Sequence, residues 1–414
     1  MSVVAKKQTA EMDAIAHEFF QNYPATEQNT SAKTLEKLSA KLGLQLLSNA
    51  TNQDSSTPGE PADFQIITET VRDYFSAQRI KEQGPLDPIP ATVQTYLNNN
   101  QATLTQIQTH LQSQEAPVWH FDVDLYADFE YALPAYIGLA DLRKLLLLKA
   151  VTHAQQNQSE QMVGALEAAQ ALIDVPAQRP DLISYLVSLI AMDDTIAIMR
   201  HLEGVPLSVS EQLLAVDQQQ LGVDRLRFDN WTFYRSLKRA LSDPTRTEDL
   251  FSPVDFGLAV LPGGVLEKPY LALSNTNTTR LREKSHDQMM GENICSLDIE
   301  ALEANLLKEV PWWNVIGKVA MPSFMAQWRK GGDRMLGAEL THHIVQAKAL
   351  AAEQGQWSET LPNLASQTCP GESWTYAVTP EGEMTLSFSQ DLSKQRPGDP
   401  DNRLPLIYQA SLAQ

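Results

Sequence analysis

The feature that most constrains this fold is a run of closely spaced helical patterns between residues 136 and 222. Leucine and alanine recur there at three- and four-residue spacing within four segments: residues 140–156, 162–175, 180–202 and 208–222. This spacing predicts amphipathic helices, and Pro176 is expected to end the second one. Because the connections are short, successive helices should run antiparallel as αα-hairpins.

Helical patterns also occur on both sides of this run. They cover residues 9–24, 34–46, 65–82, 91–114, 226–241, 297–309 and 333–354. Asn98 to Asn100 are expected to interrupt the fourth of these, and Ser208-x-x-Glu211 matches a capping box. Residues 243–280 lose the helical period and contain several prolines and glycines, so an irregular stretch is predicted there.

The C-terminal region changes to the two-residue period of a strand. Apolar and polar residues alternate in 374–378 and in 384–388, and Thr379-Pro380-Glu381-Gly382 suits a hairpin loop between them. Trp374 and Tyr376 should pair across from Phe388 and Leu386, with this aromatic face packed on the helix at 333–354. Residues 404–408 are expected to add an edge strand, because Pro405 disfavours a central place.

These patterns predict a mainly α fold: a stack of antiparallel αα-hairpins, tetratricopeptide-like in part, with a small C-terminal β-hairpin. Small residues in the 140–175 hairpin suggest the tetratricopeptide likeness, although no fixed repeat period is visible. The predicted parts are N-terminal helices (1–47), a flexible linker (48–63), a helical-hairpin core (64–332), and a long helix plus β-hairpin (333–414). The linker is rich in Ser, Thr, Asn, Gly and Pro and lacks an apolar period.

Composition and charge exclude several classes of protein. Hydrophobic residues make up 43% of the 414, which is enough for a core and excludes a wholly disordered chain. The 32 Lys and Arg against 51 Asp and Glu give a net charge of −19, which disfavours nucleic acid and anionic membranes as partners. No apolar run reaches the roughly 20 residues that span a bilayer. The N-terminus lacks the pattern of a secretory signal, so the cytoplasm is the default location.

The two cysteines, Cys295 and Cys369, are far apart in the sequence and neither belongs to a C-x-x-C pair. This spacing does not match that of zinc or thioredoxin-type sites. Two ordinary thiols are therefore expected, with a single disulfide as the alternative if the protein works in an oxidising compartment.

Three segments, residues 133–192, 311–328 and 339–388, together resemble a group of uncharacterised bacterial helical proteins. In that group a helical-hairpin core leads to a long helix, a short loop and a terminal β-hairpin. Here the loop is Gly355-Gln356-Trp357 with Leu361 and Leu364. The same end is similar to the tail of type II pseudopilins, with Trp357-Ser358 in place of the usual Tyr-Pro. The resemblance supplies no catalytic residues, but it implies an envelope-exposed domain lacking its N-terminal anchor as an alternative location.

Two Glu-x-x-His pairs, Glu283/His286 and Glu339/His342, match the spacing with which di-iron bundles present ligands on one helix face. Such a centre also needs glutamates from two further helices, and a coincidental pair is easy in an acidic chain with 8 histidines. His342 and His343 are adjacent, so they point about 100° apart on a helix and cannot chelate one ion. No metal ligand is assigned.

A second cluster concentrates carboxylates around one histidine: His120, Asp122, Asp124, Asp128 and Glu130. Calcium prefers such oxygens, but the twelve-residue loop with its central glycine is absent. Apolar residues alternate with the acids, so these side chains are expected to point outward from an extended segment.

Neither aromatic nor glycine-rich segments indicate a catalytic site. Trp312, Trp313 and Trp328 lie at helical spacing among apolar residues, so all three are expected in the core. Leu261-Pro-Gly-Gly264 lacks the Gly-Lys-Ser/Thr of a phosphate loop, and no G-x-S-x-G motif occurs.

The sequence therefore predicts a non-enzymatic helical scaffold that binds another protein or peptide, since the concave faces of αα-hairpin stacks suit extended partners. It assigns no catalytic residue, cofactor or metal, and it does not specify an oligomeric state. One alternative is a metal-dependent enzyme built on the Glu-x-x-His helices. The other, implied by the resemblance, is a cell-envelope assembly protein.

Overall fold

A computed structural model describes residues 2–46, 63–126, 136–242, 267–320, 322–392 and 403–411. Nearly all of the predicted linker (48–63) lies outside the described residues, as do Asp128, Glu130 and Leu261-Pro-Gly-Gly264. Residues 243–266 of the predicted irregular stretch at 243–280 are likewise outside them.

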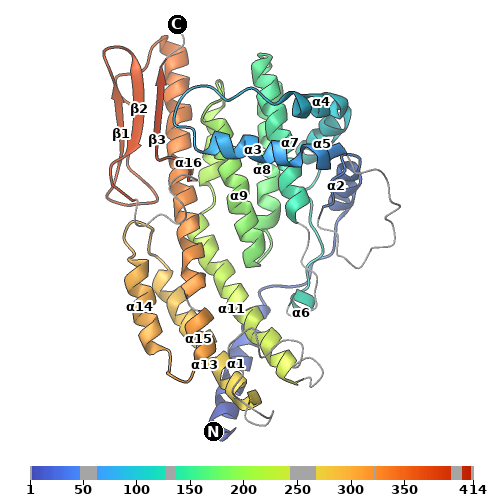
Figure 1. Cartoon of the computed structure of the whole chain (residues 1–414), viewed down its shortest axis with the longest axis vertical. Coiled ribbons are helices and arrows are strands. Elements are labelled where there is room, and N and C mark those ends of the chain that lie inside the picture. The colour runs from blue at the N-terminus through green and yellow to red at the C-terminus, as the bar shows by residue number, and fades with distance from the viewer. Residues whose placement is uncertain are drawn as a thin grey trace.

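The described fold is mainly helical, with a small antiparallel sheet near the C-terminus, as predicted (Figure 1). Its first helices are α1 (Ser2–Phe20), α2 (Thr30–Ala40), α3 (Asp63–Arg79), α4 (Ala91–Asn99), α5 (Gln101–Ser113), α6 (Val123–Tyr126), α7 (Tyr136–Gln155) and α8 (Ser159–Ala177). They are followed by α9 (Leu182–Met199), α10 (Leu207–Leu214), α11 (Gln218–Ser242), α13 (Glu267–Met289), α14 (Ile299–Glu309), α15 (Val315–Ala320) and α16 (Pro322–Gln354). The strands are β1 (Trp374–Val378), β2 (Glu383–Phe388) and β3 (Ile407–Ser411).

Helix α16 runs along much of the long axis of the molecule (Figure 1). The sheet stands beside one end of α16, while α13, α14 and α15 lie beside the other end. The largest apolar cluster joins α7 and α8 to α3, α4, α5 and α9. The leucine-rich run of the sequence is therefore the centre of the main core.

Two sequence signals for helix ends gave different outcomes. The Asn98–Asn100 interruption is confirmed, because α4 ends at Asn99 and α5 begins at Gln101. Pro176 was expected to stop α8, but the helix continues to Ala177. A proline in the last turn loses only its own backbone hydrogen bond, so one further residue can follow it.

The segment expected as one helix over 208–222 is two helices, because Asp217 caps a new start. Its Oδ1 accepts hydrogen bonds from the backbone N–H groups of Gln219 and Gln220, each at 3.0 Å, so α11 begins there. The predicted capping box at Ser208 is wrong. The N-cap of α10 is Pro206, which makes no side-chain capping bond, and Ser208 lies inside the helix.

The irregular prediction for 243–280 is wrong from residue 267 onward, where α13 begins. This helix has a buried polar face that hydrophobic periodicity cannot reveal. The amide of Asn275 donates to the carbonyl of Tyr234 at 3.0 Å, and the hydroxyl of Thr278 accepts from Asn314 at 3.1 Å. Hydrogen bonds along this polar face add to the apolar contacts that Leu281 and Met289 of the same helix make.

Helix α16 begins at Pro322, before the predicted start at residue 333, and is continuous across Lys330-Gly331-Gly332-Asp333. The glycines allow close packing. A Cβ on Gly331 would lie 2.7 Å from the backbone oxygen of Gln218, and one on Gly332 would lie 2.7 Å from the side chain of Ile294. The glycines therefore allow the start of α11 and the loop after α13 to approach α16 closely, and they do not end the helix.

The predicted hairpin register is confirmed. Trp374 pairs with Phe388 and Tyr376 pairs with Leu386 between β1 and β2. Strand β3 adds to β2 as an edge strand, at 407–411 instead of 404–408. Trp374 and Leu386 share a buried cluster with Leu336, Leu340 and Ile344 of α16. The aromatic face is therefore packed on the long helix.

A disulfide joins Cys295 to Cys369, with their Cα atoms 5.7 Å apart. The expectation of two ordinary thiols is therefore wrong, and the alternative of a single disulfide describes the fold. The bond connects the loop after α13 to the loop before β1. Because 74 residues separate the two positions, only the packing of both loops beside α16 shows that they meet.

Helix α9 is long and apolar enough to cross a membrane by length and composition, although no such segment was expected. However, 72% of it is buried inside the fold, which is also a property of core helices. It contains two adjacent buried carboxylates, Asp193 and Asp194, which bind arginines of neighbouring helices.

Candidate functional site

The carboxylate of Glu283 in the first Glu-x-x-His pair is held by protein groups. The Arg227 guanidinium donates to it at 2.8 Å and the Asn230 amide at 3.0 Å, while His286 Nδ1 lies 3.3 Å away. Burial lowers the pKa of His286. The pair is thus a contact within a buried polar cluster of α11 and α13.

The second pair is divided between two environments. Glu339 accepts four hydrogen bonds from β1 and the loop before it. The donors are Ser366 Oγ at 2.7 Å, Thr368 N at 2.5 Å, Thr368 Oγ1 at 2.6 Å and Trp374 Nε1 at 3.0 Å. His342 instead contacts Ser210 of α10 at 3.1 Å, and His343 packs against the Trp374 ring. The structure does not bring Glu339 and His342 together as a ligand pair.

In the carboxylate cluster, residues 123–126 form one helical turn rather than the expected extended segment. Asp124 forms ion pairs with Arg235 and Arg239 of α11. His120 lies 3.9 Å from the exposed Glu27. Within the described ranges, no group of three His, Cys, Asp or Glu side chains is placed to hold a metal ion.

The three tryptophans differ in burial. Trp328 is fully buried, as predicted, whereas Trp312 is 85% exposed in the turn between α14 and α15. The core prediction is therefore wrong for Trp312. Trp313 is half-buried and packs edge-on against Tyr270. The turn geometry of residues 311–314 breaks the helical spacing on which the prediction depended.

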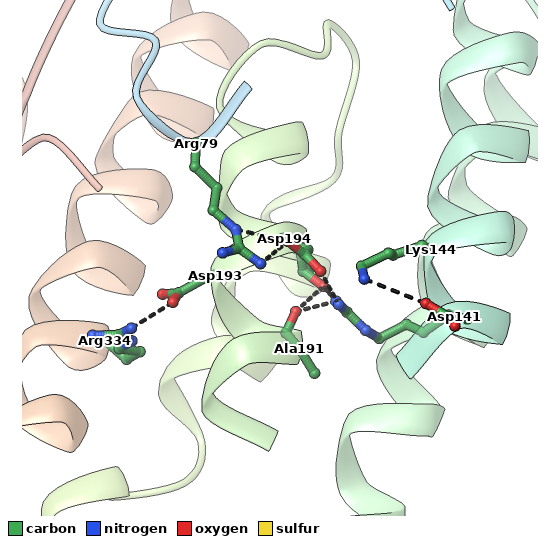
Figure 2. A network of polar contacts seen from close by, with 9 residues as sticks. Arg79, Asp141, Lys144, Ala191, Asp193, Asp194 and Arg334 are labelled. Atoms are coloured by element: carbon green, nitrogen blue, oxygen red, sulfur yellow. Dashed lines mark hydrogen bonds and ion pairs between the residues drawn. The ribbon is translucent and has the colours of Figure 1, made fainter. Parts of the chain in front are cut away.

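A network of buried charges lies where α3, α7, α9 and α16 meet (Figure 2). Asp194 accepts from Arg79 at 2.8 Å and from Arg143 at 2.6 Å, and Asp193 accepts from Arg334 at 2.5 Å. These charges come from four helices and face one another. The network therefore fixes how the helices associate, and α9 places its two carboxylates at the centre of it.

A cavity of about 340 Å³ is formed by three segments distant in sequence: the loop after α1, the segment before α6, and the end of α8. We call it the Arg179 cavity. Its lining residues are Asn22, Tyr23, Pro24, Thr26, Pro117, Val118, Trp119, Phe121, Val175, Gln178, Arg179 and Pro180. The volume lies within the range of ligand pockets in proteins, and apolar side chains dominate the lining.

Hydrogen bonds hold the walls of the Arg179 cavity together. Thr26 and Phe121 exchange two backbone hydrogen bonds of 2.8 and 3.0 Å, and Asn29 N–H donates to the carbonyl of Val118 at 3.0 Å. The indole N–H of Trp119 donates to Glu36 at 2.7 Å, which fixes the orientation of its ring. The cavity is therefore a preformed feature of the fold.

Arg179 is the only charged residue of the lining and is 6% exposed. Its Nη1 donates to the carbonyl of His120 at 3.0 Å, and its Nε faces Asp181 at 3.4 Å. The guanidinium carbon lies 5.2 Å from the centre of the Phe121 ring. Nη2 is buried but has no hydrogen-bond partner. The wall of the cavity shields this atom from solvent, so it is a buried part of the fold and not a contact point for a ligand.

The neighbouring carboxylate of Asp181 keeps Arg179 in position. Asp181 caps α9 by accepting from Ser184 N at 2.8 Å, and it also accepts from the Tyr136 hydroxyl at 3.1 Å. Burial raises the pKa of Tyr136, so this phenol remains a donor. The bonds of Nε to Asp181 and of Nη1 to the carbonyl of His120 hold the Arg179 side chain in the wall of the cavity.

The chemistry of the lining is that of a binding site. It contains no carboxylate, imidazole, thiol or lysine that could act as a general base or nucleophile. The sequence did not single out Arg179. Its only local signal is an arginine between two prolines at the start of α9, and the cavity itself depends on three segments that the fold brings together.

Comparisons of this chain with protein families, characterised proteins and solved structures found no match.

Proposed function

We propose that this protein is a non-enzymatic helical scaffold that binds an extended segment of another protein in the Arg179 cavity. One observation carries the proposal: a preformed cavity of about 340 Å³, walled by Tyr23, Trp119 and Phe121, has no carboxylate, imidazole, thiol or lysine in its lining. Such a cavity can hold an apolar side chain. The net charge of −19 favours a partner segment with basic residues.

The scaffold part of the proposal is an αα-hairpin stack, tetratricopeptide-like in part, built on α7 and α8. Only residues 156–158 separate these two helices, and buried Ala165 and Ala169 belong to the same core cluster as the leucines of α7. The last turn of α8 and the residues that follow it supply one wall of the cavity. Rigid packing of the hairpin would therefore keep Arg179 in place for a partner.

The test is selection of peptides from a phage-displayed random library on the wild-type protein, with counter-selection on a blocked variant. Gln178→Trp places a large ring at an exposed position of the cavity lining without disturbing the core. Gln161→Trp, at an exposed position of α8 outside the lining, is the matched control.

We expect enriched peptides to bind the wild type and Gln161→Trp alike and to lose binding to Gln178→Trp. If no peptide discriminates between the wild type and Gln178→Trp, the cavity is not a peptide site and the proposed function is wrong.

A further inference from the structure

Strand β1 leaves one side of its backbone unpaired. The strand order β1-β2-β3 places it at an edge of the sheet, and Figure 1 shows it at the periphery of the molecule. The N–H of Trp374 donates to the carbonyl of Leu364 at 2.7 Å, so it points away from β2. Because backbone groups in an antiparallel pair alternate between the two sides of a strand, those of Tyr376 and Val378 also point away from β2.

The residue after β1 supports this assignment. The N–H of Thr379 donates to the carbonyl of Glu383 at 2.8 Å, which is on the β2 side. Among the described residues, no group bonds to the outward N–H or carbonyl of Tyr376 or Val378. These two residues therefore offer two donors and two acceptors to an added strand.

The unpaired part of β1 is residues 376–378, which we call the open edge. Leu364 covers the end before it, and Pro380 follows it in the turn. The open edge itself has none of the devices that commonly block an edge strand, namely lysine, proline or a bulge. Its residues are exposed or only partly buried, so a partner strand can reach them.

The surroundings of the open edge are acidic. The sequence contains six acidic residues and no Lys, Arg or His from residue 349 to residue 392. Glu372 precedes β1 and Glu381 lies in the turn after it. Glu359 follows Ser358, whose carbonyl accepts from the Tyr376 hydroxyl at 2.7 Å. Within the described part of the chain, none of these three glutamates forms an ion pair. A strand that carries basic residues would complement them.

The side chains of the open edge define the rest of the partner. Tyr376 and Val378 lie on one face of β1 and pack against the buried cluster shared with α16, while Ala377 lies on the exposed face. Aromatic and β-branched residues stabilise a sheet when they pair across strands.

We propose that the open edge binds an extended segment of another protein as a fourth strand. Alternate apolar residues of this segment lie beside Tyr376 and Val378, and Lys or Arg residues flank the paired part. Main-chain hydrogen bonds supply affinity in this mode of recognition, and side chains supply specificity. The site is separate from the Arg179 cavity.

The experiment is selection from a phage-displayed random heptapeptide library on the wild-type protein, with counter-selection on Val378→Pro. Proline removes the outward N–H of residue 378 and is tolerated on an edge strand. Because Val378→Pro retains the Arg179 cavity, the counter-selection also removes peptides that bind there. Val378→Thr is the matched control, since it loses the same apolar side chain but keeps the N–H and a β-branched shape.

We expect the selected peptides to be enriched in Lys and Arg. They should bind Val378→Pro at least about tenfold more weakly than the wild type, as the loss of backbone hydrogen bonds implies. Val378→Thr should bind them as tightly as the wild type, and added salt should weaken binding. Each peptide should also slow amide exchange of residues 376–378 in the wild type, a readout that decides the question even if Val378→Pro does not fold.

The proposal is overturned if no selected peptide distinguishes Val378→Pro from Val378→Thr or slows exchange at the open edge. It is also overturned if the peptides that do so have no excess of basic residues. A wild type that sediments as a dimer, which Val378→Pro dissociates, would assign the edge to a second copy of this chain. None of these outcomes affects the proposed function, which Gln178→Trp tests.

Discussion

Replacing Trp374 by alanine should strongly destabilise the C-terminal sheet. The side chain is 2% exposed and lies in the cluster that joins β1 and β2 to α16. Its indole N–H also supplies one of the four hydrogen bonds to the buried carboxylate of Glu339. The substitution therefore creates a cavity and removes a donor from a buried charge.

Truncation of a buried aromatic to alanine costs about 3–5 kcal/mol. The lost hydrogen bond to a charged group adds about 1.5–3 kcal/mol, partly offset if water enters the space. We take about 4 kcal/mol as a cautious total, which corresponds to an increase of about 10³-fold in the equilibrium for opening of the sheet.

The assay is amide hydrogen exchange of peptides from β1 and β2, combined with denaturant unfolding followed by circular dichroism. Thr375→Ala is the matched control, because this neighbouring side chain is exposed on the other face of β1 and should change stability by less than about 0.5 kcal/mol. If Trp374→Ala exchanges as slowly as Thr375→Ala, the packing argument is wrong.

Three further predictions concern the buried charges, pH and the disulfide. Asp194→Ala should lower the free energy of unfolding by about 3–5 kcal/mol, because the buried Arg143 loses its partner. Glu309→Ala, at the exposed ion pair with Lys284, should cost less than about 1 kcal/mol. Equal denaturant midpoints would contradict this. Burial lowers the pKa of His343 from 6.5 to about 4, so the unfolded chain binds more protons between these values. The free energy of unfolding should therefore fall as pH drops from 6.5 towards 4, and that of the His343→Gln variant should fall less. Parallel pH profiles of the two proteins would show that His343 does not contribute. A reductant should lower the free energy of unfolding by about 2–4 kcal/mol through loss of the Cys295–Cys369 bond. Cys295→Ser should not respond to the reductant, and an unresponsive wild type would contradict the prediction.

Much of the fold could be predicted from local patterns. The leucine spacing in residues 140–156 predicted α7, and the alternation around Trp374 and Leu386 predicted both strands and their register. These predictions succeed because a buried face imposes its period on the sequence wherever an element is apolar on one side. The prediction for residues 267–280 failed for the same reason: this part of α13 packs a polar face through Asn275 and Thr278, so no regular apolar period marks it.

The candidate site could not be predicted from local sequence patterns. By itself the sequence determined the mainly helical class, the strand register and the acidic charge, because these follow from residues close to one another in the chain. Only the tertiary structure decided that Cys295 meets Cys369, that Glu339 and His342 face different neighbours, and that Arg179 lines a cavity formed by three distant segments. Each of these depends on which segments pack together. The free energy of that packing is summed over the whole core, and no local pattern records it.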